Sequence, residues 1–567
     1  MKITRRRIMK YLAGTVPALW WSRAFGAPRY QLPGISPSAI VPNKRRISPG
    51  PFQPAWDSLK QYQTPDWFRD AKFGIWAHWS AQCVPEQGDW YGRHMYIQGH
   101  AQNRYHVEHY GPPSQFGFKE IDNLWKAEKW DPEGLMQLYV KAGARYFVSL
   151  ANHHDNFDCY NSTHHEWNSV RIGPRKDIVG IWAKTARKHG LRFGVSNHSA
   201  HAWHWFQTAY GYDAEGSLAG VPYDGFLTKE DGKGKWWEGF DPQELYTGPN
   251  IVMPKGFTTI KAAQDWHEEH DRLWTEDPPV NNSAFVEKWF LRCQELMDRY
   301  DPDLVYFDNS ELPLGQAGLD IAAHFYNSNI GKHAGHLEAV LTSKDLRSDH
   351  TGTMVLDIER GRADRILSLP WQTDTCLGDW HYRRSLFEEH RYKTAETVIK
   401  MLVDIVSKNG NLLLSIPLRG DGTIDDDERK VLADLASWMP DNQEAIFGTR
   451  PFVVFGEGPP DIASTGNFNE GKARPYTAED IRFTTKGDIL YAIALGWPPN
   501  GKIAIKTLAR GSGSYSREIG RIELLGTRGA LPFKRDENGL TVTLPEKEPN
   551  DYAYALKITP QGDMPSK

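Results

Sequence analysis

Between Trp67 and about Gly448, short apolar runs of strand length alternate with longer segments whose apolar positions recur at helical spacing. Predicted strands cover 72–79, 145–150, 191–196, 304–307, 339–342 and 411–416, and predicted helices cover 132–142, 177–189, 285–300 and 395–408. Repeated helix-then-strand order is typical of a parallel sheet, and this many repeats favour a sheet that closes on itself. The predicted fold is therefore α/β, with a (β/α)8-like barrel over residues 61–450.

The pattern changes near Pro451, where short strand-like runs recur between turns that contain Gly, Pro and Asn. These runs cover 452–455, 481–484, 489–494, 502–507, 521–525, 540–544 and 552–558. They predict an antiparallel β-sandwich over residues 451–567. Inside the barrel region, 200–280 is rich in Gly, Trp and Asp, and we expect an elaborated loop region above the barrel mouth. Residues 27–60 begin rich in Pro, Gly and Ser, and predict a linker or extended arm.

Residues 1–26 have the character of an export signal. A basic stretch, Thr4-Arg5-Arg6-Arg7-Ile8-Met9-Lys10, precedes a moderately apolar run from 11 to 21, and Ala24-Phe25-Gly26 offers small residues for cleavage. The double arginine resembles a twin-arginine signal, which predicts a periplasmic or secreted bacterial protein with no membrane attachment after export. A basic tail with a membrane anchor is the alternative, although the apolar run is too short to span a bilayer comfortably.

The composition of the chain limits the classes of molecule that it is expected to bind. The formal net charge is −4, with 67 Lys+Arg against 71 Asp+Glu, so nothing points to nucleic acid or a membrane surface. Aromatic residues make up 12% of the chain, which suits stacking on the apolar faces of sugars but also suits a large core with domain interfaces. The four cysteines are widely spaced and include no CxxC pair, so neither a zinc motif nor a disulfide framework is predicted. We expect no cofactor.

Three of the predicted strands end in titratable side chains. The run 303–307 ends in Asp308, the first strand carries His78 near its end, and the second is followed by His153-His154-Asp155. Parallel barrels place their catalytic groups at the carboxyl ends of the strands, so we expect one shared pocket. The histidines also suggest a metal site, but adjacent histidines on an extended chain point in opposite directions and no carboxylate stands at helical spacing. We therefore predict no metal.

A series of collinear motifs runs through the predicted barrel. They are Phe68–Trp79, Asp89–Tyr91, Tyr146–Phe157, Arg175–Gly180, Leu191–Val195, Pro302–Asp308, Asn409–Leu414, Asp421–Ile424 and Glu444–Arg450. Together they resemble the α-L-fucosidases of glycoside hydrolase family 29, and the resemblance spans roughly residues 65–450. It implies an irregular catalytic barrel, a C-terminal β-sandwich, and hydrolysis of α-L-fucosides with retained configuration through a covalent fucosyl-enzyme.

The resemblance also implies roles for single residues. Matching positions are Asp308 for the nucleophile, His78, His153 and His154 for histidines that grip fucose, and Trp90 and Tyr306 for aromatic sugar contacts. The family more often has Trp where this chain has Tyr306. Trp371 stands in a Trp-Gln-Thr segment similar to the family's Trp-Glu-Thr, and it is predicted to contact the substrate as well.

The general acid/base is chosen among several carboxyls. Retaining hydrolysis needs a second carboxyl about 5–5.5 Å from the nucleophile. Glu359 stands twelve residues before Trp371, and this spacing resembles members whose acid/base precedes such a Trp; Glu311 and Asp357 are its competitors. The family often carries Asp-Arg-Trp on the preceding strand. This chain has Ser343-Lys344-Asp345-Leu346, so Lys344 and Arg360 are the candidate replacements for that arginine.

The predicted substrate is a fucosylated oligosaccharide or polysaccharide. Three alternatives stay open at this point. One is a hydrolase of the same fold for a related sugar, such as an α-L-galactoside or a sulfated fucan, and another is a non-catalytic carbohydrate-binding protein. The third is a metallohydrolase built on the histidines. Linkage preference and oligomeric state are not predicted.

Overall fold

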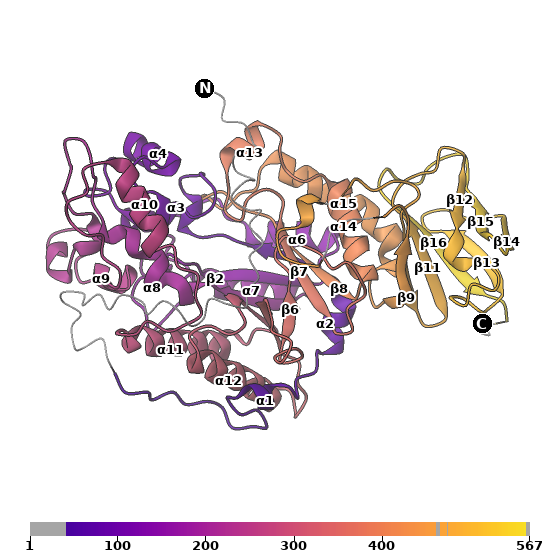
Figure 1. Cartoon of the computed structure of the whole chain (residues 1–567), viewed down its shortest axis with the longest axis horizontal. Helices are drawn as coiled ribbons and strands as arrows, with labels where there is room; N and C mark the ends of the chain where they lie inside the picture. The colour runs from indigo at the N-terminus through magenta and orange to yellow at the C-terminus, as the bar shows by residue number, and fades with distance from the viewer. Residues whose placement is uncertain (1–40, 461–464, 473, 563–567) are drawn as a thin grey trace. The chain divides into compact units, whose positions relative to one another are not determined.

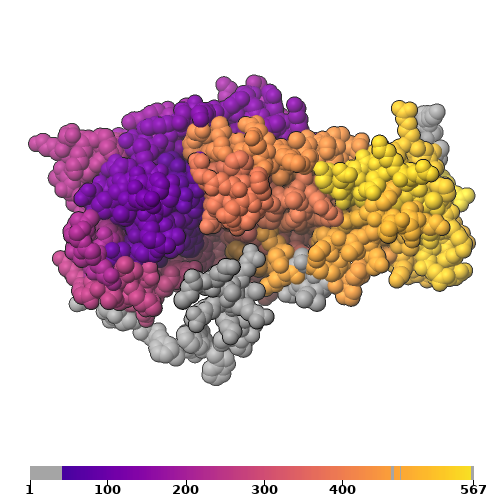
Figure 2. Space-filling model, turned by 90° about the horizontal axis from the view of Figure 1, so that it is seen from above, coloured from indigo at the N-terminus to yellow at the C-terminus, as the bar shows by residue number. Residues whose placement is uncertain are grey.

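The computed structural model describes residues 41–460, 465–472 and 474–562. Eight parallel strands form a closed barrel in which each strand pairs with the next and β8 returns to β1. The strands are β1 (Phe73–Ala77), β2 (Tyr146–Asn152), β3 (Arg192–Asn197), β4 (Leu304–Ser310), β5 (Val340–Lys344), β6 (Val355–Asp357), β7 (Trp371–Cys376) and β8 (Gly410–Ser415). The predicted α/β barrel is confirmed. In the space-filling view, early segments in indigo adjoin later segments in orange, as closure requires (Figure 2).

Helices of ten or more residues precede most of the barrel strands. They are α6 (Pro132–Lys141), α7 (Ile178–Lys188), α11 (Ser283–Tyr300), α12 (Gln316–Lys332) and α14 (Ala395–Ser407). Side-chain oxygens of Asp131, Asp177, Asn282 and Thr394 accept backbone N–H groups at four of the N-termini, which explains why those helices begin there. The barrel is irregular around β6, because residues 345–354 and 358–370, all of them described, form no helix. The sequence pattern predicted neither β6 nor β7.

The remaining helices are short or lie in connections. They are α1 (Trp56–Leu59), α2 (Asp66–Ala71), α3 (Tyr91–His94), α4 (Ala101–His109), α5 (Phe118–Leu124), α8 (Ala202–Trp205), α9 (Pro242–Leu245), α10 (Ile260–His270), α13 (Arg384–Glu388) and α15 (Asp426–Asn442). None of the helices in the described ranges is both long enough and apolar enough to cross a membrane.

The stretch 200–280 is more regular than the predicted loop region, because it contains α8, α9 and α10. Two buried ion pairs join it to the segment between β1 and β2: Arg93 with Asp271 at 2.6 Å, and Lys119 with Asp224 at 3.0 Å. Of these helices, α10 lies beside α3 and α4, and its Gln264 side chain donates to the carbonyl of Gln98 at 2.9 Å (Figure 1). A charge buried without a partner is costly, so these pairs hold the two segments together.

The predicted signal peptide, 1–26, lies outside the described residues, as does the first part of the predicted arm. The described part of the arm begins at residue 41 and runs along the outside of the barrel. The Arg45 guanidinium reaches Glu287 of α11 at 2.5 Å and Asp320 of α12 at 2.6 Å, and the Asn327 side chain accepts the Phe52 N–H at 3.0 Å. These contacts fix the arm to the helices that precede β4 and β5.

Two antiparallel sheets follow the barrel, as predicted. One has the order β13-β16-β11-β10-β9 and the other β12-β15-β14. The strands are β9 (Arg450–Glu457), β10 (Ile481–Lys486), β11 (Ile489–Ala494), β12 (Lys502–Ile505), β13 (Ile519–Leu524), β14 (Phe533–Asp536), β15 (Gly539–Thr543) and β16 (Tyr554–Pro560). Phe483, Ile503 and Val542 are among the buried residues of their shared core. A buried ion pair, Arg482 with Asp404 at 2.6 Å, joins β10 to α14 of the barrel.

Candidate active site

A cavity of about 390 Å³ lies at the carboxyl ends of the barrel strands. It is lined by seven of the eight residues that were predicted for the site: His78, Trp90, His153, His154, Tyr306, Asp308 and Glu359. They come from the ends of β1, β2 and β4, from the start of α3, and from the chain just after β6. Residues far apart in sequence therefore meet in one pocket because parallel strands end at one rim of the barrel.

Asp308 lies on β4 where its pairing with β5 becomes irregular, between Tyr306 and Ser310. Such irregularities turn a side chain away from the regular pleat and are frequent beside active sites. One carboxylate oxygen, Oδ1, contacts the ammonium of Lys344, and the other, Oδ2, lies 3.2 Å from both His154 Nε2 and His198 Nδ1. The carboxylate is thus surrounded by nitrogen atoms on both sides.

Lys344, the last residue of β5, joins the two predicted catalytic carboxyls. Its Nζ contacts Asp308 on one side and lies 2.5 Å from Glu359 Oε2 on the other. Because one nitrogen lies within hydrogen-bond distance of both carboxyls, the two oxygens that face it are less than about 6 Å apart. This limit is below the roughly 6.5–9.5 Å of inverting glycoside hydrolases and is compatible with the roughly 5–5.5 Å of retaining ones.

The two carboxyls differ in protonation. Burial works to raise the pKa of Asp308, but Lys344, His198 and His154 together outweigh it and hold that pKa well below its usual range. Burial raises the pKa of Glu359 to about 7, with repulsion from Asp374 and Asp308 acting in the same direction and Lys344 opposing. Near neutral pH one carboxyl is therefore an anion and the other carries a proton to a substantial extent. A nucleophile and a general acid need these opposite states.

The competing carboxyls lie elsewhere. The Glu311 side chain accepts the backbone N–H of Arg347 at 3.0 Å and lies 2.7 Å from His350 Nδ1, outside the cavity lining. Asp357 is fully buried and accepts an amide N–H of Gln372 at 2.5 Å. Glu359, in contrast, lines the cavity and keeps 13% of its side chain exposed. The geometry favours Glu359 of the three.

The histidines form one wall of the cavity, and all are buried. His154 Nδ1 lies 2.8 Å from the backbone carbonyl of His198, and His153 Nδ1 lies 2.8 Å from the Gln82 amide, so both rings are held in place. No described residue hydrogen-bonds either ring nitrogen of His78. Burial and neighbouring histidines keep the pKa of His78 and of His153 well below the usual value. Neutral imidazoles can both donate to and accept from hydroxyl groups.

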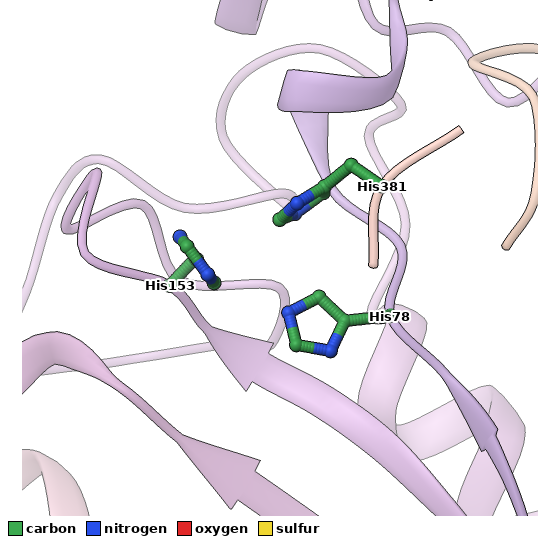
Figure 3. Close-up of side chains that lie close together, drawn as sticks. All are labelled: His78, His153 and His381. Carbon is green, nitrogen blue, oxygen red and sulfur yellow. The ribbon is translucent and has the colours of Figure 1, made fainter. Parts of the chain in front are cut away.

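Two overlapping groups of three buried histidines bring their ring nitrogens within 4.8 Å of one another. One group is His78, His153 and His381, whose rings converge from β1, from the end of β2 and from the chain after β7 (Figure 3). The other is His153, His154 and His198. Neutral imidazoles are the form that binds transition metals, and all of these histidines except His381 line the cavity. A chelator experiment distinguishes a metal from a hydroxyl-bearing ligand, as set out in the Discussion.

Aromatic rings supply much of the remaining lining. Tyr306 donates its hydroxyl to Asp374 Oδ2 at 2.9 Å, and Trp90 adopts a left-handed backbone with φ of 64° at the start of α3. The Trp90 ring lies parallel to that of Trp274, with 6.1 Å between ring centroids. Trp371 is different: it begins β7, at the opposite end from the cavity, and its indole N–H donates to the carbonyl of Lys408 at 2.9 Å. The structure places Trp371 in barrel packing.

The cavity also contains residues that were not predicted. They are Trp76, His198, Trp274, Ser310, Asp345, Asp374, Trp380, Asn467 and Phe468, and Lys344 was named only as a candidate replacement for an arginine. His198 follows a predicted strand in the same way as His78 and His153 do, so the strand-end pattern already contained it. Asp374 requires knowledge of β7, which the pattern did not predict. Asn467 and Phe468 come from beyond the barrel, and nothing in their local sequence indicates the cavity.

Comparisons with known proteins agree with this geometry. The family model described as Alpha-L-fucosidase matches residues 39–444, and that of the Alpha-L-fucosidase C-terminal domain matches residues 474–559. The tissue alpha-L-fucosidase of Homo sapiens is 26% identical over 524 residues, covering 91% of this chain and 93% of that protein. The alpha-L-fucosidase of Dictyostelium discoideum is 24% identical over 529 residues, with 90% and 95% covered.

Solved structures give the same picture. The Thermotoga maritima alpha-fucosidase in complex with a mechanism-based inhibitor has a TM-score of 0.65 to this chain and 26% sequence identity. The complex of the same enzyme with fucose has a TM-score of 0.63 and 26% identity. In each case the match covers 90% of this chain and 100% of the solved chain.

Proposed function

The chain belongs to the α-L-fucosidase family, and on that basis we propose that it releases α-L-fucose with Asp308 as the nucleophile and Glu359 as the acid/base. The enzyme is a glycoside hydrolase of the fucose-releasing kind. The observation that carries the assignment of roles is the contact of one ammonium group, Lys344 Nζ, with both carboxyls. This contact keeps the two carboxyls close together, while the pKa of Asp308 is lowered and that of Glu359 is raised.

In the first step the Asp308 carboxylate attacks the anomeric carbon of fucose. The bond from that carbon to the glycosidic oxygen breaks, and the proton of Glu359 moves to this oxygen, so the leaving alcohol departs neutral. The product is an ester between fucose and Asp308, with inverted configuration. The pKa of about 7 at Glu359 provides the protonated form near neutral pH.

In the second step Glu359, now a carboxylate, takes a proton from water. The water oxygen attacks the anomeric carbon and the ester bond to Asp308 breaks, which restores both carboxyls. Two inversions give net retention of configuration. Asp308 is a good leaving group here because the Lys344 ammonium stabilises its anion.

Lys344 takes the place of the arginine that the family often carries at this position. Burial lowers the pKa of Lys344, but Asp308 and Glu359 more than offset it, so the ammonium stays charged. An ammonium is a point charge without the planar fork of a guanidinium. In this chain the cation therefore stabilises the two carboxyls, and the sugar hydroxyls are left to the histidines.

Fucose recognition uses the buried histidine wall and the aromatic rings. His78 and His153 offer neutral ring nitrogens to hydroxyl groups, His154 lines the same wall beside Asp308, and Trp90 packs against the apolar part of the sugar. The strongest support for hydroxyl binding comes from His78, whose ring nitrogens have no partner among the described residues. Buried polar atoms normally find a hydrogen-bond partner, which a sugar hydroxyl would provide here.

The substrate is a fucosylated oligosaccharide or polysaccharide cleaved at its fucose end. The site of action is outside the cytoplasm, in the periplasm or beyond, which is supported by the twin-arginine-like stretch at Arg5-Arg6.

A substrate panel tests this proposal. L-Fucose is expected from an aryl α-L-fucoside and from fucosylated oligosaccharides, and the first-formed sugar is expected to be the α anomer by NMR. Faster turnover of an α-L-galactoside or release only from sulfated fucan would identify a different sugar. A protein that binds these glycans without cleaving any of them would contradict the catalytic roles.

A further inference from the structure

A segment from beyond the barrel, residues 465–472, reaches the chain that carries Glu359. The Asn467 side chain accepts the Glu359 backbone N–H at 3.0 Å, and the Phe468 N–H donates to the Glu359 carbonyl at 2.8 Å. The Glu470 N–H donates to the carbonyl of Arg360 at 3.0 Å, and the two side chains form an ion pair at 3.1 Å. Both backbone polar groups of the proposed acid/base are thus occupied by this segment.

Phe468 stands out within the segment. Its side chain lines the cavity, yet the residue is 61% exposed. Its backbone is left-handed, with φ of 53°, a conformation that costs an aromatic residue free energy and persists only where neighbours enforce it. The hydrogen bonds of Asn467, Phe468 and Glu470 provide that enforcement. A large apolar ring is therefore held partly in water at the rim of the cavity, next to the acid/base.

The position of this ring has a chemical meaning. The general acid protonates the glycosidic oxygen, and that oxygen belongs to the leaving group, so the leaving group lies on the Glu359 side of the site. Trp274, the other exposed aromatic residue of the lining, lies instead beside His154, with 5.4 Å between ring centroids. Sugar C–H groups are weakly positive and pack on the negative face of an aromatic ring.

We propose that Phe468 is a specificity-determining residue that binds the sugar ring of the leaving group. This inference rests on the proposed function, because it needs Glu359 to be the acid. The favoured leaving group is a pyranose that presents an apolar face, and a leaving group without a ring gains nothing from Phe468.

Two substrates separate this role from a mere support of Glu359. Methyl α-L-fucoside needs the proton of Glu359 as a disaccharide does, but its leaving group has no ring. In Phe468→Ala, kcat/KM for an α-L-fucosyl disaccharide relative to methyl α-L-fucoside should fall roughly 10-fold from its wild-type ratio. Phe468→Trp should keep the ratio near the wild-type value. Disaccharides of different linkage should differ in how far the ratio falls.

Phe533→Ala is the matched control, since Phe533 is exposed on β14 and does not line the cavity. It should leave the ratio unchanged. An equal loss on both substrates in Phe468→Ala would show that the ring only supports Glu359, and an unchanged ratio would show that the ring binds nothing; either result overturns the inference. Wild-type enzyme that cleaves neither substrate would instead overturn the proposed function.

Discussion

Lys344 Nζ lies 2.5 Å from Glu359 Oε2, and the same nitrogen contacts Asp308. A cation between two acids lowers the pKa of both, so it favours the nucleophile's anion while opposing the acid's protonation. Burial compensates at Glu359, where it is the larger effect. The site therefore combines one well-stabilised anion with one acid that keeps its proton until about neutral pH.

Replacing Asp308 by glycine is expected to lower turnover by about three to five orders of magnitude, because the covalent step is lost. Azide fits the space left by the carboxylate and should restore turnover, with β-fucosyl azide as the product. Kinetics with an aryl fucoside and NMR of the product check this. Near-normal activity in the variant would exclude Asp308 as the nucleophile.

Replacing Glu359 by alanine is expected to affect poor leaving groups most, because they need protonation. Cleavage of oligosaccharides should nearly stop, while the first step on an activated aryl fucoside should survive and the fucosyl-enzyme accumulate. Azide should then speed turnover and give α-fucosyl azide, with retained configuration.

Glu311→Ala is the control for this experiment, since Glu311 binds His350 away from the cavity, and Asp357→Ala completes the comparison. If either of these variants shows the leaving-group dependence and Glu359→Ala does not, the acid/base is assigned to the wrong residue.

The pH dependence of kcat/KM on methyl α-L-fucoside should reflect both carboxyls. Activity requires Glu359 protonated, so it should fall as pH rises through about 7. It also requires Asp308 ionised, so the acidic limb should lie well below pH 4. Lys344→Met removes a charge that lowers both pKa values, and both limbs should therefore move to higher pH. Lys400→Met, whose lysine pairs with Glu396 on α14, should leave them in place.

Removing one histidine of the cavity wall should weaken fucose binding. His153→Ala or His154→Ala is expected to cost about 1–3 kcal/mol of binding free energy, measured as the inhibition constant of L-fucose. His324→Ala is the control, because His324 is buried but bonds to Asp298 on the outer helices. Wild-type activity should survive exhaustive EDTA treatment. Activity lost to the chelator and restored by zinc would make the histidines metal ligands.

Trp371→Phe should affect stability and leave substrate affinity unchanged. The substitution removes the hydrogen bond to the Lys408 carbonyl and part of a fully packed side chain, so the free energy of unfolding should fall by about 1–3 kcal/mol. Denaturant unfolding and the KM for an aryl fucoside measure the two effects. A raised KM with unchanged stability would show that Trp371 contacts the sugar, as the sequence predicted.

The sequence predicted the regular parts of this site well. Strands that end in His78, His153 and Asp308 are apolar runs bounded by polar residues, and closure of the sheet brings their ends together. The region around Glu359 was harder to predict from the sequence, because β6 has only three residues and no helix follows it before β7. Strand and helix periodicity need longer segments to be visible. The contact between Asn467 and Glu359 joins residues more than one hundred positions apart in the sequence. A local sequence pattern does not indicate such a contact.

The two carboxyls are attached to the molecule in different ways. Asp308 sits in a strand flanked by the pairs Phe307 with Asn197 and Ser310 with Lys344. Glu359 is held from two sides: its neighbours Ile358 and Arg360 donate their backbone N–H groups to carbonyls of β7, and its own backbone bonds to a segment of the second domain. The position of the acid therefore depends on both domains, whereas the contacts described for the nucleophile's carboxylate lie within the barrel. Substitutions within 465–472 can therefore change the position of the acid, and with it the preference for a leaving group, without disturbing the barrel.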